Sequence, residues 1–279
     1  MNNRSQKALV TGATGFIGSN LVRELLRQGY AVRALVRRRS DRRNVAGLDI
    51  ELAVGDLLDR ASLDAALSGC DVLFHVAASY AFWTPKPEDL YRTNVTGTEN
   101  ILNAALAAGV KRVVHTSSES TIGIEKACVG TEEGQPDPRK LPCHYKKSKY
   151  QAECLALSMG ERGLPVVVVN PTTPIGPFDA KPTPTGQLVV DFLNHRMPAY
   201  VNTGLNIVDV EDVAKGHILA LEKGRPGERY VLGNKNLVLK EVLATLEAVS
   251  GVKAPRTRIP LGIAFVAAFF DELVTGRFL

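Results

Sequence analysis

Short apolar runs alternate along this chain with longer stretches in which apolar residues recur every three or four positions. The short runs are apolar nearly throughout, as is typical of strands buried on both faces of a parallel sheet. Six strands are predicted, at Lys7–Val10, Val32–Val36, Ile50–Val54, Val72–Val76, Arg112–Thr116 and Val166–Val169. Helices are predicted between them, at Ile17–Gln28, Ser62–Leu67, Glu88–Ala108 and Tyr145–Glu161.

This alternation predicts an α/β fold, a doubly wound parallel Rossmann sheet with a smaller C-terminal substrate lobe. After Asn170 the pattern changes, because residues 171–187 contain five prolines and no regular element is expected there. Helical patterns return at Leu188–Asn194, Val210–Glu222 and Leu239–Val249, and Ile207–Val213 is expected to return to the sheet. We therefore expect residues 1–170 and 206–224 to form a nucleotide-binding domain, and residues 171–205 and 225–279 the substrate lobe.

A glycine-rich run follows the first predicted strand and opens the first predicted helix. Its sequence is TGATGFIG, residues 11–18, and a pattern of this kind binds a dinucleotide when it lies between a strand and a helix. Gly12 and Gly15 would let the backbone approach a pyrophosphate, and Gly18 would allow close packing of helix on strand. The positive end of the helix dipole would attract the anion.

An arginine stands where the second predicted strand ends, at Arg37. Sites that prefer NAD usually have an acidic residue there to accept from the ribose hydroxyls. A guanidinium instead suits a 2′-phosphate, so Arg37 favours NADP over NAD. After the third strand, Asp56 is placed to accept from the adenine amino group while Leu57 covers the ring, although Asp56 is also a residue that caps helices.

Tyr145 and Lys149 lie four residues apart and therefore on one face of a predicted helix. An ordinary tyrosine titrates near pH 10, so acid–base work at neutral pH requires that its pKa be lowered by up to about 3 units. A neighbouring lysine ammonium is expected to lower it. The strand that ends at Thr116 brings further hydroxyls, of Thr116 and Ser117, to the edge of the sheet where ligands bind.

In this order along the chain, several motifs resemble those of the extended short-chain dehydrogenase/reductase superfamily. They are TGATGFIG, GDL at 55–57, HVAA at 75–78, YRTNVTGT around Asn94, TSSESTIG from Thr116, YKKSK from Tyr145 and NPTTP at 170–174. The resemblance implies that Tyr145 is the acid/base, that Lys149 lowers its pKa and binds the nicotinamide ribose, and that Ser118 orients the substrate oxygen. Asn94 would be a structural or proton-relay residue.

Together these assignments give three catalytic residues, Ser118, Tyr145 and Lys149, and no metal ligand. The cofactor site comprises Gly12, Gly15, Phe16, Ile17, Gly18, Arg37, Asp56, Leu57, Val76, Ala77, Ala78, Tyr145, Lys149, Pro171, Thr172, Thr173 and Pro174. Its expected cofactor is NADP, with NAD as the alternative.

Two branches of the superfamily are most similar to this chain. The arginine after the second strand, HVAA and PTTPIGP are typical of dihydroflavonol reductase-like proteins. The segments at 40–49, 170–187, 191–201 and 203–217 resemble bacterial hopanoid-associated sugar epimerases. Members of that branch continue beyond position 279, so the substrate lobe is expected to be C-terminally short. Ser118-Glu119-Ser120 stands where sugar-nucleotide dehydratases have Thr-Asp-Glu, which disfavours dehydration.

Composition and charge agree with an intracellular enzyme. The net charge of +5 comes largely from six arginines between Arg33 and Arg43, a local anion site rather than a nucleic-acid face. Four cysteines without paired spacing are typical of reduced thiols, and no signal peptide or membrane span is visible.

His75 lies in an apolar strand and is interpreted as a core histidine. The segment 80–83 contains the single tryptophan, and it either forms a wall of the substrate pocket or packs a loop.

The preferred hypothesis is a cytoplasmic NADP-dependent oxidoreductase acting on an alcohol or ketone carbon of a small, sugar-like molecule. If the oxidised intermediate stays bound and is reduced on its other face, the enzyme is a sugar epimerase. The alternatives are a dihydroflavonol reductase-like ketone reductase and a nucleotide-binding scaffold without catalysis. The family resemblance also implies a homodimer formed through the helices at 88–108 and 145–161.

Overall fold

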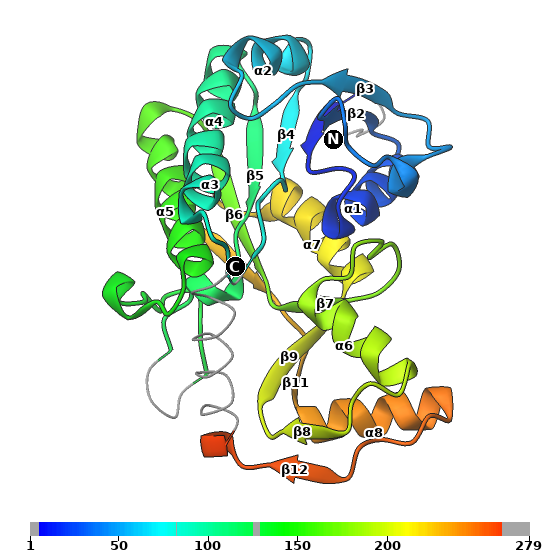
Figure 1. The fold of residues 1–279 in the computed structure, drawn as a ribbon. Coiled ribbons are helices and arrows are strands. Elements are labelled where there is room, and N and C mark those ends of the chain that lie inside the picture. Colours follow the sequence, from blue (N-terminus) through cyan, green and yellow to red (C-terminus); the bar gives the residue numbers. More distant parts are fainter. Residues whose placement is uncertain (1–5, 82, 125–128, 264–279) are drawn as a thin grey trace.

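A parallel sheet forms the centre of the computed structural model, which describes residues 6–81, 83–124 and 129–263. Within these residues the sheet has seven strands, in the order β10-β6-β5-β4-β1-β2-β3, and every neighbouring pair is parallel (Figure 1). The predicted doubly wound Rossmann sheet is thereby confirmed. Its strands are β1 (Lys7–Thr11), β2 (Ala31–Val36), β3 (Glu51–Val54), β4 (Val72–His75), β5 (Arg112–Thr116), β6 (Val166–Pro171) and β10 (Arg229–Leu232).

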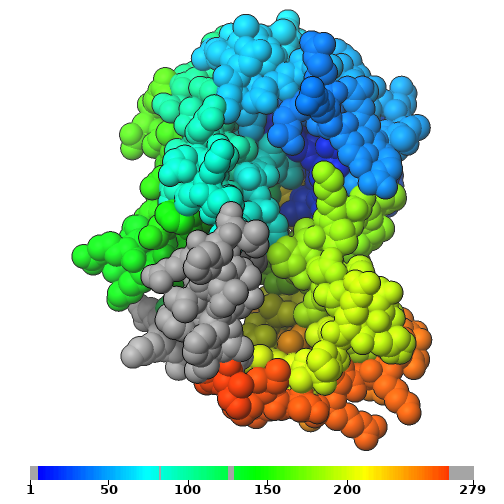
Figure 2. Space-filling view, in the orientation of Figure 1, coloured from blue at the N-terminus to red at the C-terminus, as the bar shows by residue number. Residues whose placement is uncertain are grey.

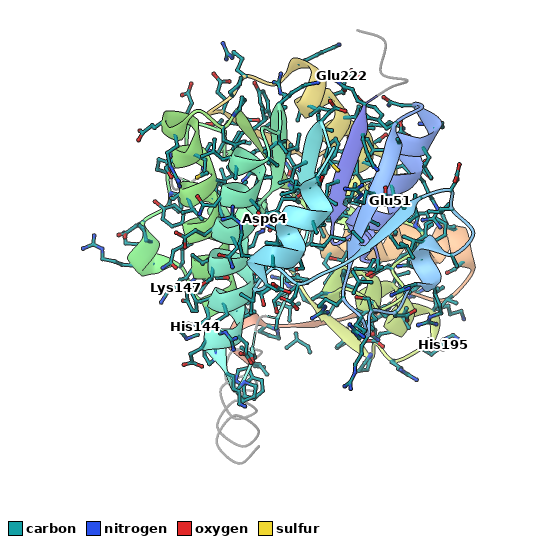
Figure 3. The ribbon with its side chains drawn as sticks, turned by 90° about the horizontal axis from the view of Figure 1, so that it is seen from above. Glu51, Asp64, His144, Lys147, His195 and Glu222 are labelled. Carbon is teal, nitrogen blue, oxygen red and sulfur yellow. The ribbon has the colours of Figure 1, made fainter. Side chains whose placement is uncertain are left out.

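Helices cover both faces of this sheet. One face carries α1 (Phe16–Arg27) and α7 (Val210–Lys223), and the other carries α2 (Arg60–Leu67), α4 (Gly97–Ala107) and α5 (His144–Ser158). Alternate residues of β1 supply the two cores: Val10 packs on the α1 side and Leu9 on the α4 side, both fully buried. Seen from above, Asp64 of α2 and Glu222 of α7 lie on opposite sides of the sheet (Figure 3).

The helix predicted at Glu88–Ala108 is built from three pieces. These are α3 (Pro87–Tyr91), a π-helical turn η3 (Arg92–Thr96) and α4. Asn94 lies in the π turn and is buried, and its amide bonds both the backbone N–H and the carbonyl of Ser79. It also donates to Ser148 Oγ at 3.0 Å. A π turn at a motif residue is a common feature of functional sites, and here it ties α5 to the loop after β4.

A smaller lobe contains two short sheets and two helices. The sheets are β11-β9-β7, from Lys235–Val238, Gly204–Asp209 and Thr173–Ile175, and β12-β8, from Thr257–Ile259 and Ala199–Val201. Its core joins α6 (Pro184–Leu193) to α8 (Leu239–Ser250) through Phe192 and Leu243. Short 3-10 turns complete the described elements, η2 (Arg43–Val45), η4 (Glu119–Thr121), η5 (Pro138–Lys140) and η6 (Met159–Arg162).

The structure corrects the predictions made for residues 171–213. The proline-rich segment is not irregular, since it contains β7 and the start of α6. Pro184 occupies the first turn of that helix, where its missing N–H costs nothing, and Thr183 caps it by accepting from Gly186 N. The strand near 207 does not return to the large sheet, because β9 pairs with β7 and β11 and α7 begins at Val210. The seventh strand of the large sheet is β10, from the range 225–279 expected in the smaller lobe.

Candidate active site

A pocket of about 810 Å³ lies at the carboxyl ends of the central strands and extends between the two lobes. The space-filling view shows this hollow between the upper lobe and the yellow-green segment of the smaller lobe (Figure 2). The residues predicted from the sequence converge here, although far apart along the chain. All of them line it: Gly12, Gly15, Phe16, Ile17, Gly18, Arg37, Asp56, Leu57, Val76, Ala77, Ala78, Ser118, Tyr145, Lys149, Pro171, Thr172, Thr173 and Pro174.

The glycine-rich turn is shaped to hold an anion. Gly12 has φ +69°, and a Cβ there would lie 2.7 Å from the backbone nitrogen of Ala77. A Cβ on Gly18 would clash with the Gly12 carbonyl. Gly15 N donates to Gly12 O and Ser19 N to Gly15 O, which leaves the amides of residues 16–18, in the first turn of α1, without an intrahelical acceptor. These amides suit the pyrophosphate of a dinucleotide.

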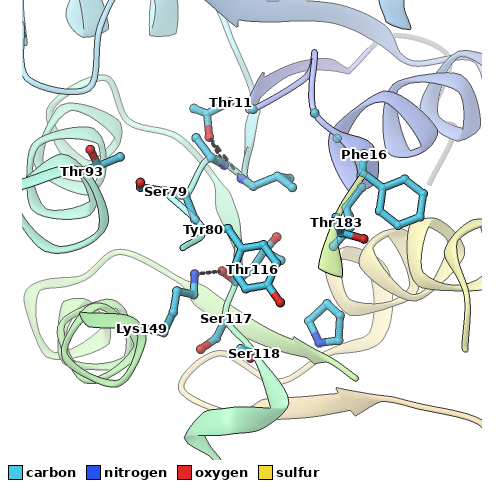
Figure 4. A pocket seen from close by; sticks show the side chains of 18 of the residues that line it. Thr11, Phe16, Ser79, Tyr80, Thr93, Thr116, Ser117, Ser118, Lys149 and Thr183 are labelled. Atoms are coloured by element: carbon cyan, nitrogen blue, oxygen red, sulfur yellow. Dashed lines mark hydrogen bonds between the residues drawn. The ribbon is translucent and has the colours of Figure 1, made fainter. Parts of the chain in front are cut away.

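Thr11 and His75 hold this turn to the end of β4. The backbone N–H groups of Val76 and Ala77 donate to Thr11 Oγ1, at 3.1 Å each (Figure 4), and Thr11 Oγ1 lies 2.8 Å from His75 Nδ1. On its other side, His75 Nε2 lies 3.0 Å from Thr98 Oγ1, which donates to the Asn94 carbonyl. Since Thr98 gives its proton to that carbonyl, His75 donates from Nε2 and accepts at Nδ1.

His75 is therefore a hydrogen-bonded core histidine, as the sequence predicted. Burial lowers its pKa to about 3, so the ring is neutral at physiological pH. The ring of its neighbour His115 packs against it, tilted by 39°, with ring centroids 5.2 Å apart.

Arg37 and Asp56 also line the pocket, just after the ends of β2 and β3. Arg37 is exposed, and its backbone N–H donates to Ser40 Oγ at 3.1 Å in a turn that also brings Ser40 to the pocket. Asp56 Oδ1 accepts from Leu58 N, so this carboxylate shapes its own turn as well as facing the pocket. Two positive neighbours of the sequence, Arg38 and Arg39, are not among the lining residues.

Lys149 and Ser118 approach Tyr145 from different elements. Lys149 is buried on α5, and its Nζ donates to the Thr116 carbonyl at 2.8 Å (Figure 4). Ser118 follows β5 and hydrogen-bonds the Tyr145 hydroxyl. The Ser118 Oγ also donates to Glu119 Oε2 at 3.0 Å. One helix and one strand end thus bring the three predicted catalytic residues together.

Burial has the largest effect on the pKa values of Tyr145 and Lys149. Burial raises the pKa of Tyr145, with smaller raising contributions from Tyr80 and Glu119, while the hydrogen bond with Ser118 opposes this rise. Lys149 Nζ donates to the Thr116 carbonyl, and the lowering of the tyrosine pKa by Lys149 stays a prediction. Burial also lowers the pKa of Lys149 to about 8, partly offset by the nearby Glu153.

A buried network fixes the segment that carries Ser118. Asn170 Nδ2 donates to the Ser118 carbonyl at 3.0 Å and to Glu153 Oε2 at 2.7 Å. Thr121 Oγ1 lies 2.6 Å from the same carboxylate oxygen, and Arg229 pairs with the other at 2.7 Å. Sequence reasoning missed Glu153 and Arg229. Glu153 follows Lys149 by one helical turn, which is a visible signal, but its partner is 76 residues away.

The smaller lobe contributes part of the pocket wall. Thr183 and Leu188 of the α6 region and Leu205 of β9 line the pocket, as does Tyr80. The Tyr80 ring packs on Tyr145 with centroids 4.7 Å apart. The segment 80–83 therefore contributes its tyrosine to the pocket, whereas Trp83 is 54% exposed and Phe82 lies outside the described residues. The sequence did not predict this part of the pocket, because the prolines around α6 suggested that the segment was irregular.

No helix within residues 6–81, 83–124 and 129–263 has both the length and the apolar character to cross a membrane.

Comparison with known proteins gives a family match over most of the chain. The model of the NAD-dependent epimerase/dehydratase family matches residues 8–233. The "Putative dihydroflavonol 4-reductase" of Synechocystis sp. is 49% identical over 270 residues, which span 95% of this chain and 78% of that protein. The crystal structure of gox2253 superposes with a TM-score of 0.89 at 46% identity, covering 98% of this chain and 83% of that one. PA4631, a nucleoside-diphosphate-sugar epimerase from Pseudomonas aeruginosa, gives a TM-score of 0.84 at 27% identity, covering 96% and 85%.

Proposed function

The chain belongs to the NAD-dependent epimerase/dehydratase family of extended short-chain dehydrogenases/reductases, and within it we propose an NADP-dependent enzyme that interconverts a ketone and its alcohol. The observation that carries the proposal is the convergence of Ser118, Tyr145 and Lys149 in the same pocket as the glycine-rich turn. A reductase is favoured because a relative with 49% identity bears a reductase name.

The residues present fit a dinucleotide. The left-handed Gly12 turn, the open amides at the start of α1 and the exposed Arg37 line one end of the pocket. We propose that Arg37 binds a 2′-phosphate and that the amides bind the pyrophosphate. When bound, a nicotinamide cofactor supplies the hydride acceptor or donor of such a reaction.

The chain's own residues handle the proton. During reduction, the Tyr145 hydroxyl gives its proton to the substrate oxygen, and in the reverse direction it takes the proton back. Ser118 donates a hydrogen bond to the same oxygen and stabilises the negative charge that develops there. Because burial raises the Tyr145 pKa, release of its proton depends on positive charge nearby, and the Lys149 ammonium on the next helical turn is the side chain placed to supply it.

Replacement of Tyr145 by Phe tests this assignment. The variant keeps the ring that packs on Tyr80 and removes only the hydroxyl. Turnover of a ketone panel with NADPH should fall by at least about 100-fold, whereas NADPH affinity, measured by calorimetry, should change little. Turnover retained within a few fold would contradict the role of Tyr145.

A sugar epimerase is the second candidate, favoured by the segments that resemble hopanoid-associated epimerases and by the likeness to PA4631. The two functions differ in how the protein treats its cofactor. An epimerase recycles it internally, so denaturing freshly purified protein should release about one NADP or NAD per chain, identifiable by mass spectrometry. A protein that carries none and binds NADPH much better than NADH supports the reductase.

We also propose a homodimer formed through the face that carries α4 and α5, as the family resemblance implies. Light scattering after gel filtration gives the mass in solution and tests this directly. A monomer at micromolar concentration would contradict it.

A further inference from the structure

The hydrogen-bonding capacity of the Ser118 hydroxyl is already used within the protein. Its Oγ accepts from the Ser120 backbone N–H at 3.2 Å and from the Ser120 hydroxyl at 3.0 Å. Its single proton is directed at Glu119 Oε2, 3.0 Å away. A serine hydroxyl has one proton to donate and two lone pairs. To donate to a substrate oxygen, Ser118 must therefore turn away from Glu119.

Glu119 has few other donors that could replace that proton. Besides Ser118, its carboxylate accepts from its own backbone N–H. Lys146 is near enough to lower its pKa slightly, yet among the described residues Glu119 forms no ion pair within 4.0 Å. Once substrate displaces water from the pocket, the carboxylate oxygen that loses Ser118 is left unsatisfied, which is unfavourable.

The position of Glu119 determines where a replacement donor must lie. It is the residue after Ser118, lines the same pocket and is exposed. Desolvation there raises the pKa of its carboxyl, and the hydrogen bond from Ser118 opposes this rise. A donor that reaches Glu119 while the reacting oxygen reaches Ser118 has to be close to that oxygen in the substrate.

We infer that Glu119 is a specificity-determining residue that accepts a hydrogen bond from a hydroxyl on the carbon next to the one that reacts. The favoured substrates are thus α-hydroxy ketones, or the matching diols in the oxidative direction. This inference rests on the proposed function and extends it. A plain ketone can still bind Ser118 and Tyr145, but it leaves Glu119 without a donor.

The test compares matched ketones with and without the neighbouring hydroxyl. Suitable pairs are 2-hydroxycyclohexanone with cyclohexanone, and acetoin with butanone. For each, kcat/KM is measured with NADPH, and the alcohol product is quantified by gas chromatography. Because the hydroxyl also makes the carbonyl more electrophilic, the diagnostic quantity is the change in the hydroxy-to-plain ratio between variants, and not the ratio itself.

The wild-type ratio should exceed that of Glu119→Ala by about 10- to 100-fold, because a site built to bind a hydroxyl discriminates strongly against its absence. In Glu119→Ala the kcat/KM for the hydroxy ketone should fall, whereas the kcat/KM for the plain ketone should stay within about threefold of the wild-type value. Glu119→Gln retains an acceptor oxygen and should be intermediate. Glu161→Ala, an exposed glutamate just after α5, is the control and should keep the wild-type ratio.

Three outcomes separate this inference from the function on which it rests. A ratio unchanged in Glu119→Ala overturns the inference and leaves the reductase assignment intact. An equal loss on both ketones also overturns it, since that is the behaviour of a residue that only maintains the structure of the site. If wild type consumes neither member of any pair, the proposed function fails and the inference falls with it.

Discussion

The guanidinium of Arg229 donates to the carboxylate of Glu153 across 2.7 Å, and both side chains are almost fully buried. Glu153 lies one turn beyond Lys149 on α5, and Arg229 opens the edge strand β10. The same arginine donates to the carbonyls of Glu132 and Gly134. The pair therefore joins the helix that carries Tyr145 and Lys149 to the edge of the sheet and, through Asn170, to Ser118.

Replacing Arg229 by Met should destabilise the protein by about 3–5 kcal/mol, because it leaves a buried carboxylate without its cation. Urea unfolding measures this loss. In the double variant Arg229→Met with Glu153→Gln, the unpaired carboxylate is also removed, and part of the stability should return. A loss below about 1 kcal/mol in the single variant would show that the pair contributes little.

Gly12→Ala should weaken dinucleotide binding as well as stability. The new methyl group would require a left-handed backbone for a residue with a side chain and would meet Ala77 N at 2.7 Å. Gly109 is the matched control, with φ +68° and nothing within 4 Å of a Cβ. Gly109→Ala should cost only the backbone strain, about 1 kcal/mol, with NADPH affinity unchanged. Equal NADPH affinity for both variants would refute a special role for Gly12.

Arg37→Ala should reduce NADPH affinity by about 10- to 100-fold, the loss expected when a charge-assisted phosphate contact is removed. NADH affinity should stay within about twofold, because NADH lacks the 2′-phosphate. Arg39→Ala is the control, since Arg39 is equally exposed but does not line the pocket. Titration calorimetry measures the affinity of each variant for NADPH and for NADH. An equal loss of affinity for both cofactors in Arg37→Ala would mean that Arg37 does not recognise the 2′-phosphate.

Acid should destabilise the fold through buried histidines. His217 donates from Nδ1 to the Val213 carbonyl and accepts from Thr116 Oγ1 at Nε2, an arrangement that requires the neutral ring. Burial lowers its pKa to about 4, below the ordinary value of 6.5. Between these values the unfolded chain binds more protons, so stability decreases as the pH falls from about 6.5 to 4, by about 3 kcal/mol for this residue.

Unfolding measured at pH 7 and at pH 5 tests this pH dependence. His217→Gln should be less stable than wild type at pH 7 but lose less stability on acidification. The exposed His144 is the control, and His144→Gln should keep the wild-type difference between the two pH values. An unchanged difference in His217→Gln would mean that other groups cause the acid sensitivity.

Local patterns were enough to predict most of the large lobe. Its six predicted strands lie within one or two residues of β1 to β6, because each is a short, mainly apolar run and the helices between them show a clear period. The smaller lobe was harder to predict. Its strands β7 and β8 have three residues each, too short for any period to be visible, and Pro184 looked like an interruption where it begins a helix.

The sequence by itself determined the chemistry available to this protein: the glycine turn, the arginine after β2 and a tyrosine one helical turn from a lysine. These are properties of adjacent residues, and adjacency is what a sequence records. Only the tertiary structure decided how that chemistry is arranged. The direction of the Lys149 ammonium, the ion pair between Glu153 and Arg229, and the contact of Ser118 with Glu119 all depend on burial and on which chain segments meet at the end of the sheet. Desolvation, which sets the pKa of Tyr145 and of His217, has no local signature, because it depends on everything packed around a group.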